Sequence, residues 1–310
     1  MNQKSESAEC PATPTLGHLY RLTRPYSWVC STAVSVAAWV FSGGGPGMAA
    51  LLIPLSLSAL LWVGLNWLSD SIQRDAGRVP PPAALLLATL ALSLALAAVQ
   101  SASACAWALI HYLLVLAYAR KKHSAKVGAV SYLLRGGTVF AACASVGAAA
   151  NGAWFPQGDA FWFIASQSLA HAARNLIGDI RDMKTDRYEL PVTHGAKLAV
   201  VVAVVCLVAA GGAALMMRIL VADTTLFIVA LLLGVLWLML YGRRLGYDIA
   251  GRRLHHLMVF VFSAFTLWCS YRLGVWWGWV SIGSGLLIAL HMTYYDNPGK
   301  SFRAKSMTKV

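Results

Sequence analysis

The feature that most constrains this sequence is a series of long apolar blocks, which together occupy most of its 310 residues. A bilayer core about 30 Å thick takes roughly 20 apolar residues of helix. By that measure the sequence predicts spans near residues 27–43, 48–66, 83–101, 103–118, 128–150, 159–176, 197–217, 224–241, 255–272 and 276–293. The connection Tyr271–Val275 is short, so the last two blocks form either a hairpin or one kinked element, and we expect nine or ten spans.

Composition supports this interpretation. The chain is 58% hydrophobic and 12% charged, with a mean hydropathy of +0.63, whereas about a quarter of the residues in a soluble domain are charged. The apolar residues form continuous blocks and not amphipathic stripes, which excludes a disordered chain, a collagen, a disulfide-stapled secreted fold and a basic nucleic-acid-binding domain. We therefore expect an all-α, polytopic membrane helix bundle.

The formal charge of +13 has a topological explanation. With ten spans, 22 of the 25 Lys and Arg residues fall on one side of the membrane, and this excess marks the cytoplasmic side. The first 26 residues lack the pattern of a cleavable signal. The predicted organisation is a cytoplasmic N-terminal segment (1–26), a transmembrane domain (27–293) and a basic C-terminal tail (294–310) of a multi-pass protein in the cell (inner) membrane.

Acidic residues gather where the sixth apolar block meets a cytoplasmic loop. If the helix continues, Asn175, Asp179, Asp182 and Asp186 lie within roughly 60° of one another. Three stacked carboxylates repel, so a divalent cation between them explains the pattern. An oxygen-only ligand set favours Mg²⁺ over zinc. The alternative is a solvated helix end, whose acids pair with the neighbouring cations Arg174, Arg181, Lys184 and Arg187.

Another acidic cluster, the first along the chain, follows the second apolar block. Asn66 and Asp70 are one helical turn apart and share a face, but Asp75 lies about 140° away from Asp70 around an ideal helix. Asp75 joins them only if the helix ends or bends, which the run Pro80–Pro82 favours. Alone this cluster is a weak signal, and it gains weight from its counterpart after the sixth block.

Between these clusters, after the fourth block, Tyr118 and Lys122 are one helical turn apart. A lysine-rich loop is also the ordinary product of the positive-inside rule. The functional interpretation is that both residues reach an anionic group that the two acidic clusters hold through metal ions.

These three motifs in this order resemble the UbiA superfamily of intramembrane prenyltransferases. The resemblance extends from Arg21 to about Lys197, and its most specific part is residues 178–195, which carry Asp182, Asp186 and a trailing Leu-Pro-Val segment that ends at Gly195. It implies a helical bundle around a central cavity, with the acidic motifs facing each other under a cytoplasmic cap.

The first motif departs from the family pattern, which has acids where this chain has Trp67 and Arg74. Only Asp70 is in place, and Asp75 is one residue late. The resemblance therefore leaves open whether Asp75 replaces the missing acids. It also leaves open a terpene cyclase of the same superfamily.

The function that the resemblance implies is Mg²⁺-dependent transfer of a polyprenyl group from a prenyl diphosphate to a hydrophobic or aromatic acceptor at the cytoplasmic face of the membrane. Two groups of residues would carry it. The metal ligands are Asn66, Asp70, Asp75, Asp179, Asp182 and Asp186. The diphosphate contacts are Tyr118 and Lys122, with Arg24, Lys121 and Arg181 as further candidates. An ion or organic-anion transporter is a rival of another class, although its acids are expected at the midplane.

Other polar residues in the apolar blocks have simpler interpretations. Arg135 lies inside the fifth block and needs a partner, either in the cavity or in an internal ion pair or carbonyl contact. His111 and His171 are expected to be hydrogen-bonded core residues. The aromatic residues Trp276, Trp277, Trp279, Tyr294 and Tyr295 are expected at the membrane interfaces.

Overall fold

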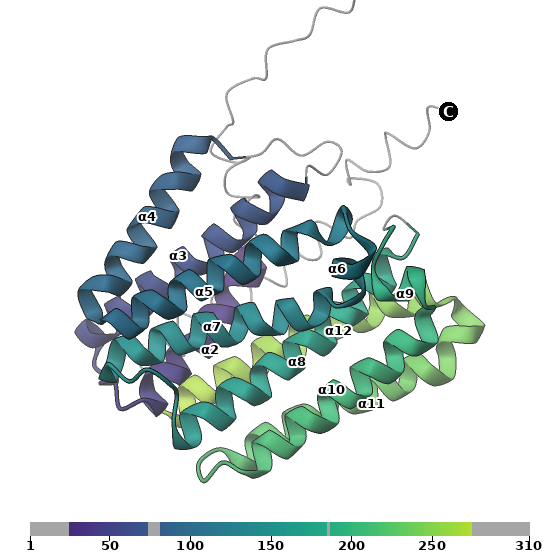
Figure 1. The fold of residues 1–310 in the computed structure, drawn as a ribbon. Helices are drawn as coiled ribbons and strands as arrows, with labels where there is room; N and C mark the ends of the chain where they lie inside the picture. Colours follow the sequence, from purple (N-terminus) through teal and green to yellow (C-terminus); the bar gives the residue numbers. More distant parts are fainter. Residues whose placement is uncertain (1–24, 74–80, 185–186, 275–310) are drawn as a thin grey trace, which may run out of the picture.

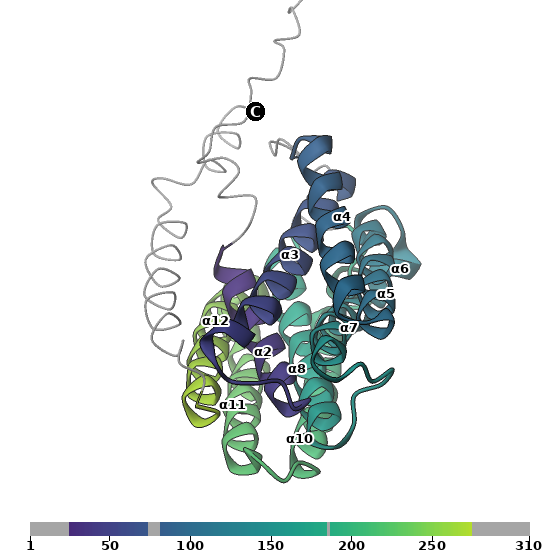
Figure 2. The same ribbon diagram turned by 90° about the vertical axis from the view of Figure 1, so that its left-hand side faces the viewer.

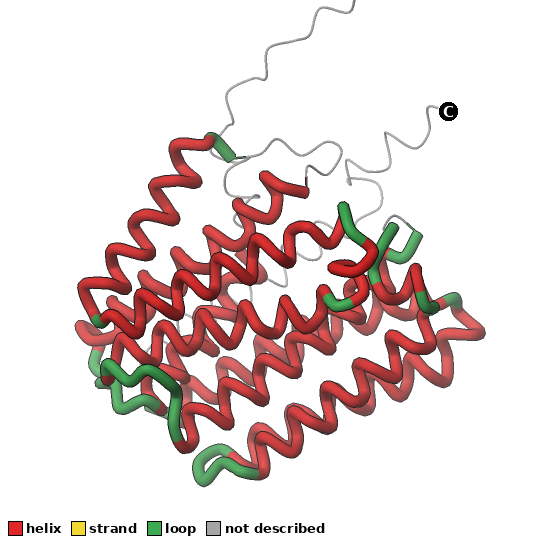
Figure 3. The backbone as a smooth tube through the Cα atoms, in the orientation of Figure 1, coloured by secondary structure: helices red, strands yellow, loops and turns green. Residues whose placement is uncertain are grey.

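The computed structural model describes residues 25–73, 81–184 and 187–274. Within these ranges the chain is helical and contains no strand (Figures 1 and 3). The long helices are α2 (Pro25–Phe41), α3 (Met48–Gln73), α4 (Ala83–Gln100), α5 (Ala102–Ala119), α7 (Ser131–Asn151), α8 (Gly158–Asp182), α10 (Ala196–Leu215), α11 (Val221–Leu245) and α12 (Tyr247–Arg272). The short ones are η1 (Arg120–Lys122), α6 (Ala125–Ala129) and α9 (Leu190–Thr193).

Six of the described helices are long and apolar enough to cross a membrane: α3, α4, α5, α7, α10 and α11. The prediction of an all-helical, multi-pass bundle is thus confirmed at this level. Each of the first nine predicted spans corresponds to a long helix. The tenth predicted span, the aromatic residues that begin at Trp276, and the tail from residue 294 lie outside the described residues.

Helix α8 is the central element of the bundle. It packs against α2, α7, α10 and α12, and Figure 2 shows these helices around it. Its apolar face includes Phe163, Leu176 and Ile180, which are buried in the larger of two hydrophobic clusters. The smaller cluster joins α3 and α5 through residues such as Leu61 and Ala108. Burying α8 on several sides fixes the position of its polar residues.

Close packing between α7 and α8 depends on a small residue. A Cβ at Gly136 would lie 2.8 Å from the backbone oxygen of Ser168, which is closer than real contacts allow. The absence of a side chain lets the two backbones approach, as small residues do in membrane helix pairs. This approach brings the first turn of α7 beside the last turns of α8.

The helices that carry the two acidic clusters extend beyond their apolar blocks. Helix α3 continues from the predicted end at residue 66 to Gln73, and α8 continues from residue 176 to Asp182. Asn66, Asp70, Asp179 and Asp182 are therefore on helices. Helix α8 ends at Asp182, and Asp186 lies outside the described residues.

A candidate active site at the ends of α3, α5 and α8

The end of α5 is tied to the end of α3. Helix α5 stops at Ala119, and the chain turns through η1 to His123. The Nε2 atom of His123 lies 3.3 Å from the carbonyl oxygen of Ile72, in the last turn of α3. The motifs that follow the second and fourth apolar blocks therefore meet at one end of the bundle.

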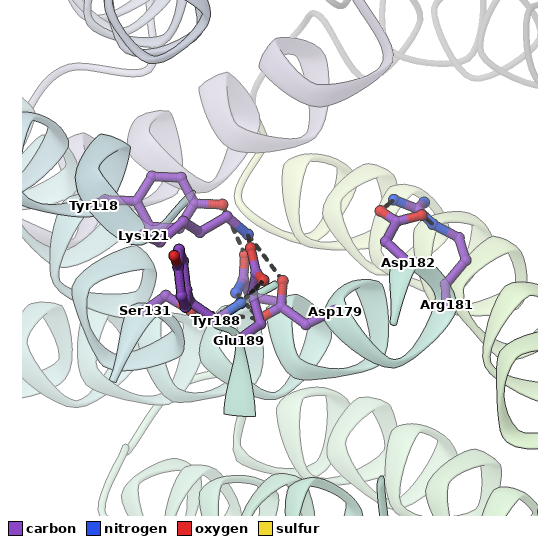
Figure 4. A network of polar contacts seen from close by, with 9 residues as sticks. Tyr118, Lys121, Ser131, Asp179, Arg181, Asp182, Tyr188 and Glu189 are labelled. Carbon is purple, nitrogen blue, oxygen red and sulfur yellow. Dashed lines mark hydrogen bonds and ion pairs between the residues drawn. The ribbon is translucent and has the colours of Figure 1, made fainter. Parts of the chain in front are cut away.

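A closed ring of polar contacts joins α5 and η1 to α8 (Figure 4). The Tyr118 hydroxyl donates to Asn175 Oδ1 at 3.1 Å, and Asn175 Nδ2 donates to Asp179 Oδ2 at 3.0 Å. The Lys121 ammonium donates to Asp179 Oδ1 at 2.9 Å and lies 5.2 Å from the centre of the Tyr118 ring, a cation–π contact. The motifs after the fourth and sixth apolar blocks thus share one network.

Two further residues contact Lys121 or Asp179. Ser131, the first residue of α7, donates to Asp179 Oδ2 at 3.4 Å. Glu189, immediately before α9, is fully buried, and its Oε1 atom lies 3.7 Å from Lys121 Nζ. Its other carboxylate oxygen accepts the backbone N–H of Tyr188 at 3.2 Å. Lys121 therefore lies between two carboxylates from different segments.

Burial and charge act in opposite directions on Lys121. Burial by itself lowers the pKa of an ammonium group, but the Asp179 carboxylate, assisted by Tyr118 and Glu189, raises the pKa of Lys121 well above its usual 10.5. Lys121 stays charged at any physiological pH. The network is thus a true ion pair in the low-dielectric end of the bundle.

Asp182 has different surroundings. Its carboxylate accepts from the neighbouring Arg181, whose Nε atom lies 2.9 Å from Asp182 Oδ1. The side chains of both residues are 28% exposed, and Arg181 also donates to His255 of α12 at 3.2 Å. This pair agrees with part of the solvated-helix-end alternative. Lys184, another cation of that alternative, instead pairs with Asp248 at 2.6 Å.

The first acidic cluster is buried on α3. Asn66 and Asp70 are 1% and 4% exposed, one turn apart as predicted. Asp75 lies outside the described residues, and the described part of α3 ends at Gln73. The structure therefore places two of the three predicted ligands of this motif.

Arg135 projects into the same end of the bundle from α7. Its guanidinium lies 5.2 Å from the centre of the Trp62 ring of α3 and 5.7 Å from that of Tyr118. It therefore connects α3, which carries Asn66 and Asp70, to α5, which carries Tyr118. The two histidines match their expected core role: His111 contacts backbone oxygens of Leu61 and Thr138, and His171 contacts that of Gln167.

Several predicted site residues fall outside what the structure describes. Arg24, Asp75 and Asp186 belong to segments outside the described ranges, and the side chain of Lys122 is also undescribed. Among the residues that are described, no group of three or more His, Cys, Asp or Glu side chains comes together as a metal site. Four members of the predicted ligand set have described positions: Asn66, Asp70, Asp179 and Asp182.

Sequence reasoning missed Glu189 and Ser131. Glu189 is one of only 12 acidic residues in the chain, and it precedes a Leu-Pro pair at a cytoplasmic boundary. That position was a usable signal. Ser131 carried none, because a serine at the start of a helix is common.

Comparison with known proteins identifies the fold of this chain. No family model matches this sequence, and no curated protein sequence matches it. Three solved structures do resemble its structure. A UbiA homologue from Aeropyrum pernix K1, in its apo form, is 17% identical with a TM-score of 0.58 and covers 77% of this chain and 96% of its own.

The other two structures extend the likeness. A digeranylgeranylglyceryl phosphate synthase is 15% identical with a TM-score of 0.61, covering 83% of this chain and 98% of its own. A UbiA homologue from Archaeoglobus fulgidus, bound to GPP and Mg²⁺, is 16% identical with a TM-score of 0.52, covering 80% of this chain and 99% of its own.

This chain has the UbiA fold. The likeness spans nearly the whole length of each related structure, so the fold is matched as a unit and not as a fragment. Within this UbiA fold the polar ends of α3, α5 and α8 are the natural candidate for an active site. Activity depends on the side chains at a site and not on the fold alone, and polar side chains gather at these helix ends.

Proposed function

We propose that this chain is a membrane prenyltransferase of the UbiA superfamily, which moves a polyprenyl group from a prenyl diphosphate to a lipid-soluble or aromatic acceptor. The observation that carries the proposal is the meeting of three motifs at one end of a UbiA-fold bundle. Tyr118, Asn175 and Asp179 are joined by direct hydrogen bonds, and His123 ties this network to α3.

The described residues fit a magnesium requirement by their donor chemistry. Asn66, Asp70 and Asp182 offer only oxygen ligands, the set that hard cations prefer. Asp75 and Asp186 would add carboxylates to the first and second sites. When bound, Mg²⁺ would neutralise charge on the departing diphosphate. The related structure that contains both GPP and Mg²⁺ supports a magnesium requirement.

The cationic side chains of this end would bind the diphosphate. Arg181 is partly exposed, and its guanidinium presents several N–H donors beside Asp182. Lys122 and Arg24 are the other candidates for this role. Arg181 and Lys121 both have partners already, but Lys121 is the weaker candidate because it is only 8% exposed between Asp179 and Glu189, whereas Arg181 is 28% exposed.

The apolar bundle suits the remainder of the reaction. The allylic carbon–oxygen bond breaks, the electron pair leaves with the diphosphate, and the prenyl group becomes a carbocation that water would destroy. A water-poor site among membrane helices protects that cation until the acceptor attacks it and loses a proton. Aromatic rings at this end, such as Trp62 and Tyr118, provide negative π faces, although Arg135 already occupies part of this surface.

The lysine and arginine distribution supports a cytoplasmic orientation for this end. Residues between α5 and α7 carry Arg120, Lys121, Lys122 and Lys126, and those between α8 and α10 carry Lys184 and Arg187. Cytoplasmic loops are enriched in such residues. The proposed site would therefore receive its diphosphate donor from the cytoplasmic side.

The experiment follows release of diphosphate from labelled geranyl, farnesyl and geranylgeranyl diphosphates by the purified protein in nanodiscs. It is run with Mg²⁺ and with chelator, and with membrane lipid extract as a source of acceptor. Asp182→Asn removes one proposed ligand. Asp159→Asn, at the opposite end of the same helix, is the matched control.

The proposal expects Mg²⁺-dependent release that Asp182→Asn lowers strongly and Asp159→Asn retains. A prenylated acceptor in the organic products identifies a transferase, whereas cyclised hydrocarbons formed without acceptor identify a terpene cyclase. No release from any donor, by protein that elutes as a folded particle, contradicts both and favours a transporter.

A further inference from the structure

Asp179 and Asp182 lie one turn apart at the end of α8, and both belong to the predicted second metal motif. Figure 4 shows that their side chains belong to separate groups. Asp179 faces Lys121 and Ser131, whereas Asp182 lies beside Arg181. The exposed fractions of the two side chains differ accordingly, 5% for Asp179 and 28% for Asp182.

The contacts of Asp179 leave little coordinating capacity. Its Oδ1 atom accepts from Lys121, and its Oδ2 atom accepts from both Asn175 and Ser131. A Mg²⁺ ion binds carboxylate oxygen at about 2.0–2.1 Å and demands near-octahedral geometry. Such an ion at Oδ1 would have to replace or repel an ammonium group that already lies 2.9 Å from that atom.

We propose that Asp179 is a positioning residue and not a metal ligand, and that the Lys121–Asp179–Glu189 ion network holds the diphosphate-binding end together. This inference rests on the proposed function. The metal ligands of the second motif then begin at Asp182. Asp182 also pairs with a cation, because Arg181 contacts its two carboxylate oxygens at 2.9 Å and 2.5 Å. The two pairs differ in burial: Arg181 and Asp182 are each 28% exposed, so Arg181 can move into solvent, whereas Lys121 and Asp179 are 8% and 5% exposed.

The network joins segments that the proposed reaction requires in one place. Lys121 immediately precedes Lys122, a candidate diphosphate contact, so fixing Lys121 fixes the local backbone of η1. Glu189 lies seven residues after Asp182, and its contact with Lys121 holds the far end of the intervening segment. That segment contains Asp186. One ammonium group thereby joins η1 to the end of α8 and to the residue before α9.

The closing experiment compares single and combined neutral variants in nanodiscs. Lys121→Met leaves the buried carboxylates of Asp179 and Glu189 without their shared ammonium group, and Asp179→Asn leaves Lys121 with only the more distant of these two carboxylates, that of Glu189 at 3.7 Å. The triple variant Lys121→Met/Asp179→Asn/Glu189→Gln removes all three charges together and keeps the shape of the network. Asp182→Asn is the comparison for a true ligand. Two quantities are measured: the thermal midpoint without ligands, and the Mg²⁺ concentration that gives half-maximal diphosphate release.

We expect each single variant to lower the thermal midpoint, because a buried charge that loses a counter-charge destabilises the folded protein. The triple variant should recover most of the loss, because it contains none of the three charges. The triple variant should keep its half-maximal Mg²⁺ concentration within about twofold of wild type, whereas Asp182→Asn should raise it at least tenfold. A rise in the triple variant equal to that of Asp182→Asn would overturn the assignment. So would a fall for Lys121→Met, which would show that the ammonium competes with the metal at Asp179.

The thermal midpoints can be measured whether or not the protein is active. If wild-type protein releases no diphosphate, the proposed function fails while the coupling among the three charges is still measured. If release is normal but the triple variant is no more stable than either single variant, the network inference fails alone.

Discussion

Asp179 and Asp182 are the same residue type on the same helix, separated by less than one turn, yet their environments differ completely. Asp179 is enclosed by donors from three segments, whereas Asp182 lies at a partly exposed helix end beside Arg181. A buried carboxylate whose lone pairs are satisfied contributes to structure, and a more open one remains able to bind a ligand. The comparison shows that two aspartates of one sequence motif can lie in different environments, which is the basis of the different roles proposed for them.

The largest expected effect is a loss of diphosphate release when Asp182, and not Asp179, is the proposed metal ligand that is removed. Asp182→Asn should lower diphosphate release by about 10²–10³-fold, the usual cost of removing one group that stabilises developing charge. Its thermal midpoint should stay near that of wild type because the side chain is partly exposed. Rates and midpoints measured on the same preparation check this. Normal release by this variant would remove Asp182 from the site.

Leucine substitutions at the two aspartates should lower the free energy of unfolding by different amounts. Asp179→Leu should cost about 3–5 kcal/mol, the usual result of breaking one side of a buried ion pair. Asp182→Leu should cost about 1 kcal/mol or less, as expected for a pair in contact with solvent. Equilibrium unfolding in mixed micelles gives both values. Equal costs would mean that the Asp179 network is not more important for stability than the Asp182 pair.

The close contact between α6 and Tyr188 provides a third prediction. A Cβ at Gly128 in α6 would clash with the carbonyl group of Tyr188, the neighbour of Glu189. Gly128→Ala should therefore destabilise the protein by about 1–3 kcal/mol. Gly212→Ala in α10 is the matched control, because a Cβ at that position would meet nothing within 4 Å and alanine favours a helix. Unfolding curves of the two variants should shift in opposite directions.

The pH dependence of the ion network is the fourth prediction. The folded pKa of Lys121 lies above its ordinary 10.5, so its contribution to stability is fully present below pH 10.5 and is lost as the pH rises through the folded value. The difference in thermal midpoint between wild type and Lys121→Met should thus stay constant from pH 7 to pH 10. A difference that shrinks across that range would mean that Lys121 is not held by its carboxylates.

The smallest effect is expected at the opposite end of the bundle. Arg218 is 85% exposed, and its Nε atom lies 3.7 Å from Asp159. Exposed ion pairs contribute about 0–1 kcal/mol. Arg218→Ala should leave both stability and diphosphate release unchanged within error. A clear loss of release would extend the functional region beyond the end that holds Asp179 and Asp182.

Much of the site was predictable because charged residues are rare in an apolar chain. Asn66, Asp70, Tyr118 and Asp182 stand out against long hydrophobic blocks, and their recurrence at helix ends indicated a shared location. What the pattern did not give was the partner of each group. Lys121 and Lys122 are adjacent and chemically identical, so no sequence rule distinguishes the one that binds Asp179.

The sequence by itself determined the fold class, because continuous apolar blocks of roughly 20 residues leave a chain few options other than membrane helices. It also determined which residues bear the polar chemistry. Only the tertiary structure decided how those residues are divided. Glu189 approaches Lys121 after a separation of 68 positions, and Asn175 meets Tyr118 after 57. Contacts over such separations depend on how α5, α7 and α8 pack, which local patterns do not encode.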